Sequence, residues 1–186
     1  GQIKAGGSIA SLKADGDILI DLISGATFGA LWALGDIGAE GDGITIDVGE
    51  GDLTVDTWGS LEADINAPGQ ITINAFESVQ GELESANKGV ELNTWQNMAV
   101  EYIKGYEKVK TWAFGGILML TGEAKSEQEI EMAAWGDIKI DSADAILSTS
   151  FLAGGALLLK LIATASLQAC TYSTLTVVDA KTWIGG

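Results

Sequence analysis

The sequence predicts an all-β protein of one domain, a parallel β-helix (β-solenoid) with about 19 residues per coil. Aromatic residues recur at intervals of 18 to 21 residues, followed by a last interval of 16. Around each one, apolar or small residues occupy alternate positions, which is the period of a β-strand. Glycine is frequent between these runs, with 25 residues in the chain. The recurring aromatic residues are Trp58, Phe76, Trp95, Phe114, Trp135 and Phe151.

The clearest repeats span residues 53–142. In each repeat, the run before the aromatic residue predicts one strand and the run after it predicts a second. The expected strands are 53–57, 61–65, 71–75, 79–83, 90–94, 98–102, 109–113, 117–121, 130–134 and 138–142. Looser versions of the pattern at 16–48 and 146–186 predict further coils, so that residues 1–186 form a single domain. About ten coils at roughly 4.8 Å each would make a rod on the order of 45 Å long.

Alternate residues of each run are expected to face the inside of the coil. The same alternation points the aromatic residue outward, unless the corner between the two strands changes the phase and buries it. Both arrangements are compatible with the sequence, and an exposed aromatic stripe would need a partner. The expected inward-facing residues are Leu53, Val55, Leu61, Ile71, Ile73, Val79, Val90, Leu92, Met98, Ile117, Ile130, Met132, Ile138 and Ile140.

The composition limits the chemistry of the chain. Its net charge is −16, all ten basic residues are lysines, and histidine and arginine are absent. Such an acidic surface repels nucleic acid and anionic membranes. Without histidine the chain lacks the usual general base near neutral pH, and without arginine it lacks a bidentate clamp for phosphate. We therefore expect no enzyme and no cofactor. Paired carboxylates leave a polysaccharide-cleaving β-helix as the alternative.

Acidic residues are densest between residues 35 and 56, where no lysine occurs. Calcium is bound by several converging oxygen ligands, which Gly-Asp-Gly and Gly-Glu-Gly-Asp corners can offer. The candidate calcium ligands are therefore Asp42, Asp47, Glu50 and Asp52. The calcium-binding nonapeptide repeat is not present, and solvated corners that oppose aggregation are the favoured interpretation.

Three lysines, Lys104, Lys108 and Lys110, surround Tyr106. A basic and aromatic patch of this kind can bind a glycan or an acidic segment. The favoured alternative is that these lysines neutralise the neighbouring carboxylates of Glu101 and Glu107.

Cys170 is the only cysteine, so that no intrachain disulfide can form. It is out of phase with the small apolar run Ala163 to Ala169, and we expect it to face outward or to lie at a corner. Residues 151–170 are the most apolar stretch, and a membrane span is the alternative to strands there. Lys160 at the centre and the alternation of polar with apolar residues favour strands and predict no membrane span.

Both ends of the chain have the pattern of a repeat. Residues 1–7 already look like the middle of a coil, and residues 182–186 stop abruptly. Solenoids need polar caps at their ends, and neither end has the composition of a cap. We therefore expect the chain to be a fragment of a longer repeat protein.

Three segments share a glycine, a polar residue and then alternating apolar and polar residues: 1–9, 51–55 and 69–75. This signature resembles the roughly 19-residue repeats of filamentous-haemagglutinin-like exoproteins. The resemblance implies a right-handed parallel β-helix from a two-partner-secreted adhesin or contact-inhibition protein. The aromatic residue at a fixed position departs from the plainer pattern of that family, and no site residues carry over.

The expected function is a structural rod, a non-catalytic shaft segment of a fibrous adhesin that is secreted or lies at the cell surface. A self-assembling β-solenoid filament subunit is the first alternative, because open coils expose β-edges. A polysaccharide-binding or polysaccharide-cleaving β-helix is the second. The expected partners are adjacent coils of the same longer protein, copies of the chain itself, or the surface of a host or neighbouring cell.

Overall fold

The computed structural model describes residues 1–38, 41 and 43–182, and the regular structure in this part of the chain is all β-strand. The strands form one continuous parallel sheet of 15 strands that winds into a β-solenoid, which confirms the predicted fold class. The strands are β1 (Gln2–Ala14), β2 (Leu22–Ala33), β3 (Ile44–Glu50), β4 (Leu53–Thr57), β5 (Leu61–Ala67), β6 (Ile71–Ala75), β7 (Val79–Ser85), β8 (Val90–Thr94), β9 (Met98–Gly105), β10 (Lys108–Ala113), β11 (Leu118–Ser126), β12 (Glu129–Ala134), β13 (Ile138–Ala153), β14 (Leu157–Thr171) and β15 (Leu175–Thr182).

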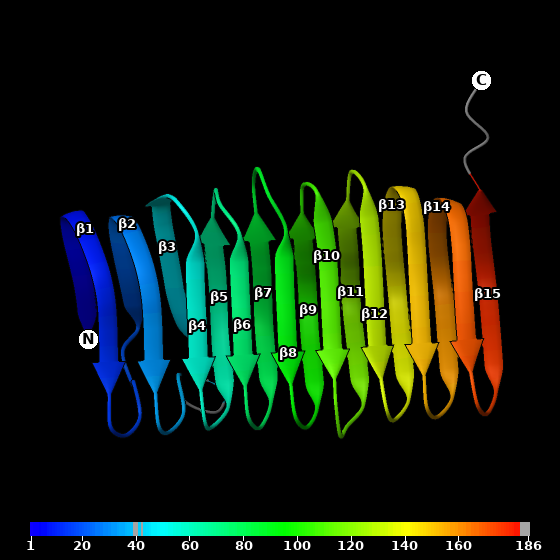
Figure 1. The fold of residues 1–186 in the computed structure, drawn as a ribbon, viewed down its shortest axis with the longest axis horizontal. Coiled ribbons are helices and arrows are strands. Elements are labelled where there is room, and N and C mark those ends of the chain that lie inside the picture. Colours follow the sequence, from blue (N-terminus) through cyan, green and yellow to red (C-terminus); the bar gives the residue numbers. More distant parts are fainter. Residues whose placement is uncertain (39–40, 42, 183–186) are drawn as a thin grey trace.

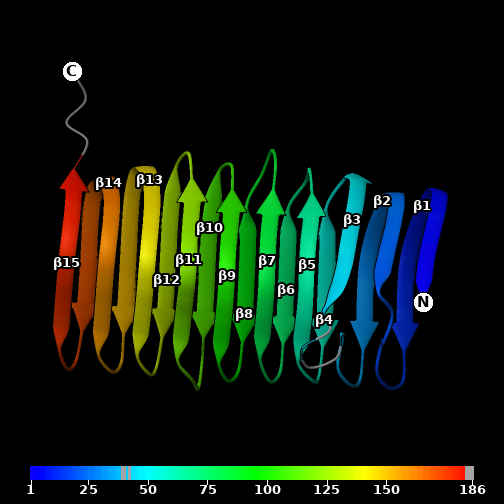
Figure 2. The same ribbon diagram turned by 180° about the vertical axis from the view of Figure 1, so that it is seen from behind.

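The solenoid is a rod with two broad faces. One face, here called the β6 face, carries β4, β6, β8, β10 and β12 (Figure 1). The opposite face, here called the β5 face, carries β3, β5, β7, β9, β11 and β15 (Figure 2). The long strands β1, β2, β13 and β14 bend across a corner and contribute to both faces. Coils follow one another along the rod in chain order, so that each coil contacts mainly its two neighbours.

Neighbouring coils pair in register. Ile71 of β6 pairs with Val90 of β8, and Val90 pairs with Val109 of β10, so that these coils are 19 residues apart. The coil from β2 to β4 is longer: Leu31 pairs with Val55, which is 24 residues further along the chain. Equivalent side chains therefore stack along the rod at about one strand spacing, roughly 4.8 Å.

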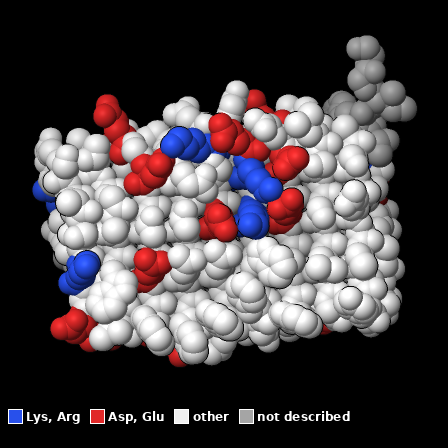
Figure 3. All heavy atoms as spheres, viewed as in Figure 1, with Lys and Arg blue, Asp and Glu red and all other residues white. Residues whose placement is uncertain are grey.

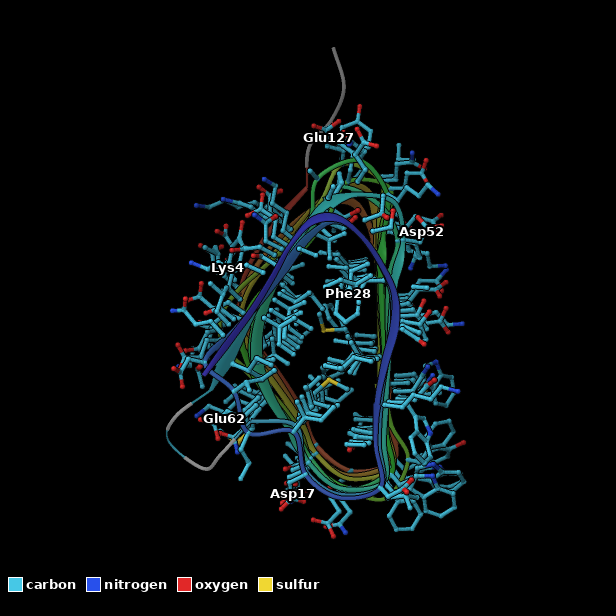
Figure 4. The ribbon with its side chains drawn as sticks, turned by 90° about the vertical axis from the view of Figure 1, so that its left-hand side faces the viewer. Lys4, Asp17, Phe28, Asp52, Glu62 and Glu127 are labelled. Carbon is cyan, nitrogen blue, oxygen red and sulfur yellow. The ribbon has the colours of Figure 1, made fainter. Side chains whose placement is uncertain are left out.

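The inside of the coils is filled by stacked apolar side chains (Figure 4). Phe28, which is fully buried, points into this interior from β2. All the residues that the sequence predicts to face inward are buried, with the exception of Ile117. Alternation along each strand identifies the core residues because one side of every strand faces the inside of the coil and is buried against the opposite face.

The prediction for Ile117 is wrong by one residue. Ile117 is 42% exposed, whereas Leu118 is 2% exposed and pairs with Met98. The corner from Phe114 to Leu118 has one more residue than the corner from Trp95 to Met98. Because side chains alternate with a period of exactly two, a single extra residue moves every following side chain to the other face.

A second change of phase lies inside the strands of the β5 face. The register shifts between Gly81 and Glu82 of β7, opposite Val100 and Tyr102 of β9. Beyond this bulge Ile103 is buried, and Tyr102 is only partly buried. A bulge of this kind adds a residue on one strand and bends it, which turns the strand toward the corner.

The corners are held by short polar side chains that bond to the next coil. The backbone N–H of Ser60 donates to Asp36 Oδ1 at 2.6 Å, and that of Ala156 donates to Asp137 Oδ1 at 2.6 Å. The hydroxyl of the buried Thr57 donates to the carbonyl oxygen of Gly35. Backbone groups that leave the sheet at a corner are therefore still satisfied, as buried polar groups require.

The apolar stretch 151–170 forms strands, as its alternation predicts. Its residues belong to β13 and β14 and to the short corner that joins them. Cys170 is exposed, as predicted. Within the described residues, no helix has the length and apolar character needed to cross a membrane.

Replacing Ile73 by alanine should destabilise the fold. Ile73 is fully buried and pairs with Val55 on one neighbouring coil and Leu92 on the other. Removal of its side chain leaves a cavity between two packed coils, and we expect a loss of about 2–5 kcal/mol in the free energy of unfolding. The measurement is the midpoint of urea denaturation followed by circular dichroism.

The matched control is Thr72→Ala on the same strand, where the side chain points outward and is not fully buried. Its midpoint should change by less than about 0.5 kcal/mol in free energy. Equal midpoints for Ile73→Ala and the unmodified chain would show that β6 is assigned to the wrong phase.

Candidate functional site: an aromatic groove

Five aromatic side chains form an exposed ladder along one corner of the rod. Trp58 and Trp95 are each 60% exposed, and Trp135 is 71% exposed. Figure 4 shows rings that project outward together at the corner near Asp17. The sequence left open whether these side chains are buried or exposed, and the structure places them outside. This ladder consists of Trp58, Phe76, Trp95, Phe114 and Trp135.

The first four rings of the ladder, from Trp58 to Phe114, lie against one another. The ring centroids of Trp58 and Phe76 are 5.8 Å apart with an interplanar angle of 23°, and those of Trp95 and Phe114 are 5.1 Å apart at 27°. Phe76 and Trp95 are 6.3 Å apart and more tilted, at 36°. These separations are in the range of favourable offset stacking, so that the four rings form one continuous aromatic surface.

The sheet sets the spacing of the ladder. Each aromatic residue directly follows an inward-facing threonine or alanine at the end of a strand of the β6 face, and therefore points outward. The backbone N–H of Phe76 donates to the carbonyl of Thr57, and that of Phe114 donates to the carbonyl of Thr94. Parallel pairing thus continues one residue past each strand and holds successive rings one strand spacing apart.

Phe151 does not belong to this ladder, and its assignment to the repeating frame is wrong. It pairs with Met132, faces inward and is 1% exposed. The residue in register with Trp135 is Gly154, because Ala134 pairs with Ala153. A Cβ atom at Gly154 would lie 2.0 Å from the carbonyl oxygen of Trp135. The local backbone therefore excludes a side chain there, and the ladder stops.

A row of polar side chains runs beside the ladder on the outer side of the β6 face. Asn74 Nδ2 donates to Asp56 Oδ1 at 2.7 Å, and Asn93 Nδ2 donates to Asn74 Oδ1 at 3.0 Å. The same row continues with Trp32 before Asp56 and Trp112 after Asn93. Trp112 also stacks on Phe114, with ring centroids 5.5 Å apart. We call Asp56, Asn74 and Asn93 the polar row.

The ladder and the polar row enclose a shallow groove of about 670 Å³ that is open along the rod. Figure 3 shows the β6 face with its charged side chains gathered toward the upper edge, and the lower band beyond them largely uncharged. Apolar rings on one side and amide groups on the other make this groove amphipathic. Its lining residues are Trp32, Asp56, Thr57, Trp58, Asn74, Ala75, Phe76, Asn93, Trp95 and Phe114.

Sequence reasoning missed the polar row and the two flanking tryptophans. All of these residues stand two positions before an apolar corner residue, as Asn74 stands before Phe76 and Trp112 before Phe114. That constant offset was the available signal. Alternation alone predicts that these side chains face outward. It does not show which outward side chains become neighbours, because that depends on the register between strands.

The lysines around Tyr106 are engaged in ion pairs. Lys104 Nζ lies 2.7 Å from Glu84 Oε1, and Lys108 Nζ lies 2.8 Å from Glu131 Oε2. The hydrogen bonds that the two lysines donate to these carboxylates raise the pKa of both lysines. Lys110 lies 3.6 Å from Glu91. The partners belong to neighbouring coils, whereas the sequence suggested Glu101 and Glu107.

The candidate calcium ligands do not form a cluster in the described residues. Asp42 lies outside them. Asp47 and Glu50 are exposed on β3, and Asp52 accepts hydrogen bonds from the backbone N–H of Gln70 and from Lys88 Nζ at 2.9 Å. The bond from Lys88 lowers the pKa of the Asp52 carboxyl. Among the residues that the structure describes, no three acidic or cysteine side chains come together as a metal site requires.

Comparison with known proteins adds no relative: no family model matches the chain, and neither a curated protein nor a solved structure matches it significantly.

Replacing Gly154 by alanine should destabilise the corner that ends the ladder. The added methyl group would overlap with the backbone of Trp135, and neighbouring coils must shift to accommodate it. We expect a loss of about 1–3 kcal/mol in the free energy of unfolding, measured by urea denaturation.

The control for this change is Gly7→Ala, because a Cβ atom at Gly7 meets nothing within 4 Å. That variant should stay within about 0.5 kcal/mol of the unmodified chain. If the two variants were equally stable, close packing at Gly154 would not be the reason that the ladder stops there.

Proposed function

We propose that this chain is a non-catalytic structural rod, a shaft segment of a secreted or cell-surface fibrous adhesin. The observation that supports this proposal is the unbroken parallel pairing from β1 to β15. Every inner coil bonds to the coil before it and to the coil after it on both faces. The reach of such a stack grows by one strand spacing with each added coil, which is the property a shaft needs.

The surface charge fits an extended rod that stays dispersed. The net charge of −16 opposes lateral association of long flat faces. On both faces lysines pair with carboxylates of the adjacent coil, as Lys104 pairs with Glu84 on the β5 face and Lys108 with Glu131 at 2.8 Å on the β6 face. Exposed pairs of this kind contribute little each, but together they offset part of the repulsion among the many carboxylates of the surface.

The location outside the cell rests on the resemblance of the glycine-led repeats to filamentous-haemagglutinin-like exoproteins. The absence of histidine and arginine from the sequence supports a role without acid–base or phosphate chemistry. An antibody raised against the chain should therefore label intact cells that make the protein, or their medium. A signal that appears only after the cells are lysed would contradict this location.

A rod built of interchangeable coils should tolerate the loss of a whole coil. Deletion of residues 71–89 brings Val90 to the position of Ile71, its own partner in register. The shortened chain should fold with the same strand content and be shorter by roughly 4.8 Å. Circular dichroism tests the fold, and small-angle X-ray scattering measures the length.

A deletion of similar length that cuts inside the strands, residues 74–91, provides the control. It joins Ile73 directly to Leu92, two residues that both face inward, so that one of them must turn outward and the coil should lose stability. Failure of both deletions to fold would contradict the view that the coils are equivalent units.

A further inference from the structure

We propose that the aromatic groove binds an uncharged, linear polysaccharide whose sugar rings lie along the axis of the rod. This activity goes beyond the structural role proposed above and does not depend on where the rod is located. Three properties of the groove carry the inference: the orientation of its aromatic rings, the free hydrogen-bonding capacity of its polar row, and its charge.

The aromatic side offers a continuous apolar platform. Trp58 and Phe76 are nearly parallel and stacked on each other, and so are Trp95 and Phe114, with interplanar angles of 23° and 27°. Both tryptophans are 60% exposed. An apolar ring surface of this size is normally covered by a partner. Successive rings cover part of each other's faces, and the parts that remain open to solvent form one apolar wall. Sugar rings present flat faces of C–H groups, which can pack against such a wall.

The polar side offers donors and acceptors at one strand spacing. Each asparagine amide has two N–H donors and a carbonyl oxygen with two lone pairs. The bonds within the polar row use one N–H donor of Asn74 and one of Asn93, and as acceptors one oxygen of Asp56 and the amide oxygen of Asn74. The remaining groups point into an open groove, where the hydroxyl groups of a polysaccharide can donate and accept in turn.

The repeat along the rod selects a linear ligand. From Trp32 to Trp112 the row advances by four coils, roughly 19 Å. The aromatic rings recur at every coil from Trp58 to Phe114, and the polar row runs parallel to them. A chain of sugar rings along the axis can therefore meet an aromatic side chain at each of these coils, and the polar groups of Asp56, Asn74 and Asn93 beside the first three.

The charge of the groove selects an uncharged ligand. Asp56 is the one charged side chain among the described residues that line it. This carboxylate, together with the net charge of −16, repels uronic-acid and sulfated polymers. Hydroxyl groups of a neutral glycan can instead donate to the carboxylate and replace the water that leaves it.

A second copy of the chain fits the groove less well. Apposition of two ladders would bury Asp56 of each copy, and the groove supplies no cation to pair with it. An ionised carboxylate that is buried without a partner is strongly unfavourable. The like charges of the two rods add to this cost.

The test uses the full chain and a panel of soluble neutral polysaccharides: hydroxyethyl cellulose, laminarin, galactomannan, xylan and soluble starch. Polygalacturonate is the anionic probe. Binding is measured by affinity electrophoresis and by the change in tryptophan fluorescence. We expect at least one neutral polymer to bind and polygalacturonate not to bind. Trp95→Ala should weaken that binding roughly tenfold or more, as loss of a central aromatic anchor does, and Asn74→Ala should weaken it as well.

Tyr172→Ala is the matched control, because Tyr172 occupies the ladder position beyond Gly154 and is 85% exposed but lies away from the groove. It should bind as the unmodified chain does. Urea denaturation of each variant verifies that Trp95→Ala and Asn74→Ala remain folded.

Three results would overturn the proposal. The first is no binding to any neutral polymer of the panel. The second is binding that Trp95→Ala and Tyr172→Ala affect equally. The third is self-association of the unmodified chain that Trp95→Ala abolishes, because the ladder would then be an interface between copies.

Discussion

The hydrogen bonds between coils, made in register from one parallel strand to the next, are the interaction on which the structure depends. They fix the separation of equivalent residues at one strand spacing on both faces. From this single constraint follow the stacked core, the ion pairs that bridge successive coils, and the aromatic ladder. A slip of one residue in any coil would reverse the inside and outside of all the side chains that follow within it. Corner side chains such as Asp36 and Thr57 keep the pairing intact where the chain turns.

The groove is a direct product of this constraint and not of a specialised loop. Trp58, Phe76 and Trp95 come from different coils, and each lies at the corner that follows its own strand. No single repeat contains a binding site. Repetition turns one outward aromatic residue and one outward polar residue from each of three successive coils into two parallel rows. The rings are partly buried against one another, but each tryptophan of the ladder keeps more than half of its surface exposed. An exposed apolar stripe of this kind is a candidate contact surface.

Much of the fold could be predicted because each coil repeats the same physical problem. Ile71, Ile73 and Leu92 face inward as alternation requires, and errors arise only where a corner or bulge changes the count, as at Ile117. The spacing of aromatic residues was less reliable, since Phe151 fits the interval only loosely and pairs with Met132 in the core. The ion pairs could not be predicted. Lys108 contacts Glu131 on the next coil, and this pairing depends on the exact number of residues in the coil, which the sequence pattern alone does not determine.

The most direct test of the account is a distance between residues on the same row of the β6 face. Thr54 and Glu131 are four coils apart, through Thr72, Glu91 and Lys110. Spin labels attached to Thr54→Cys and Glu131→Cys in a Cys170→Ser background can be measured by double electron–electron resonance. In-register stacking places the two backbone positions roughly 19 Å apart. It therefore predicts a narrow distribution of distances between the two labels, which differs from this value by no more than the length of the label side chains. A broad distribution, or one centred far beyond this distance, would contradict the stacked-coil structure.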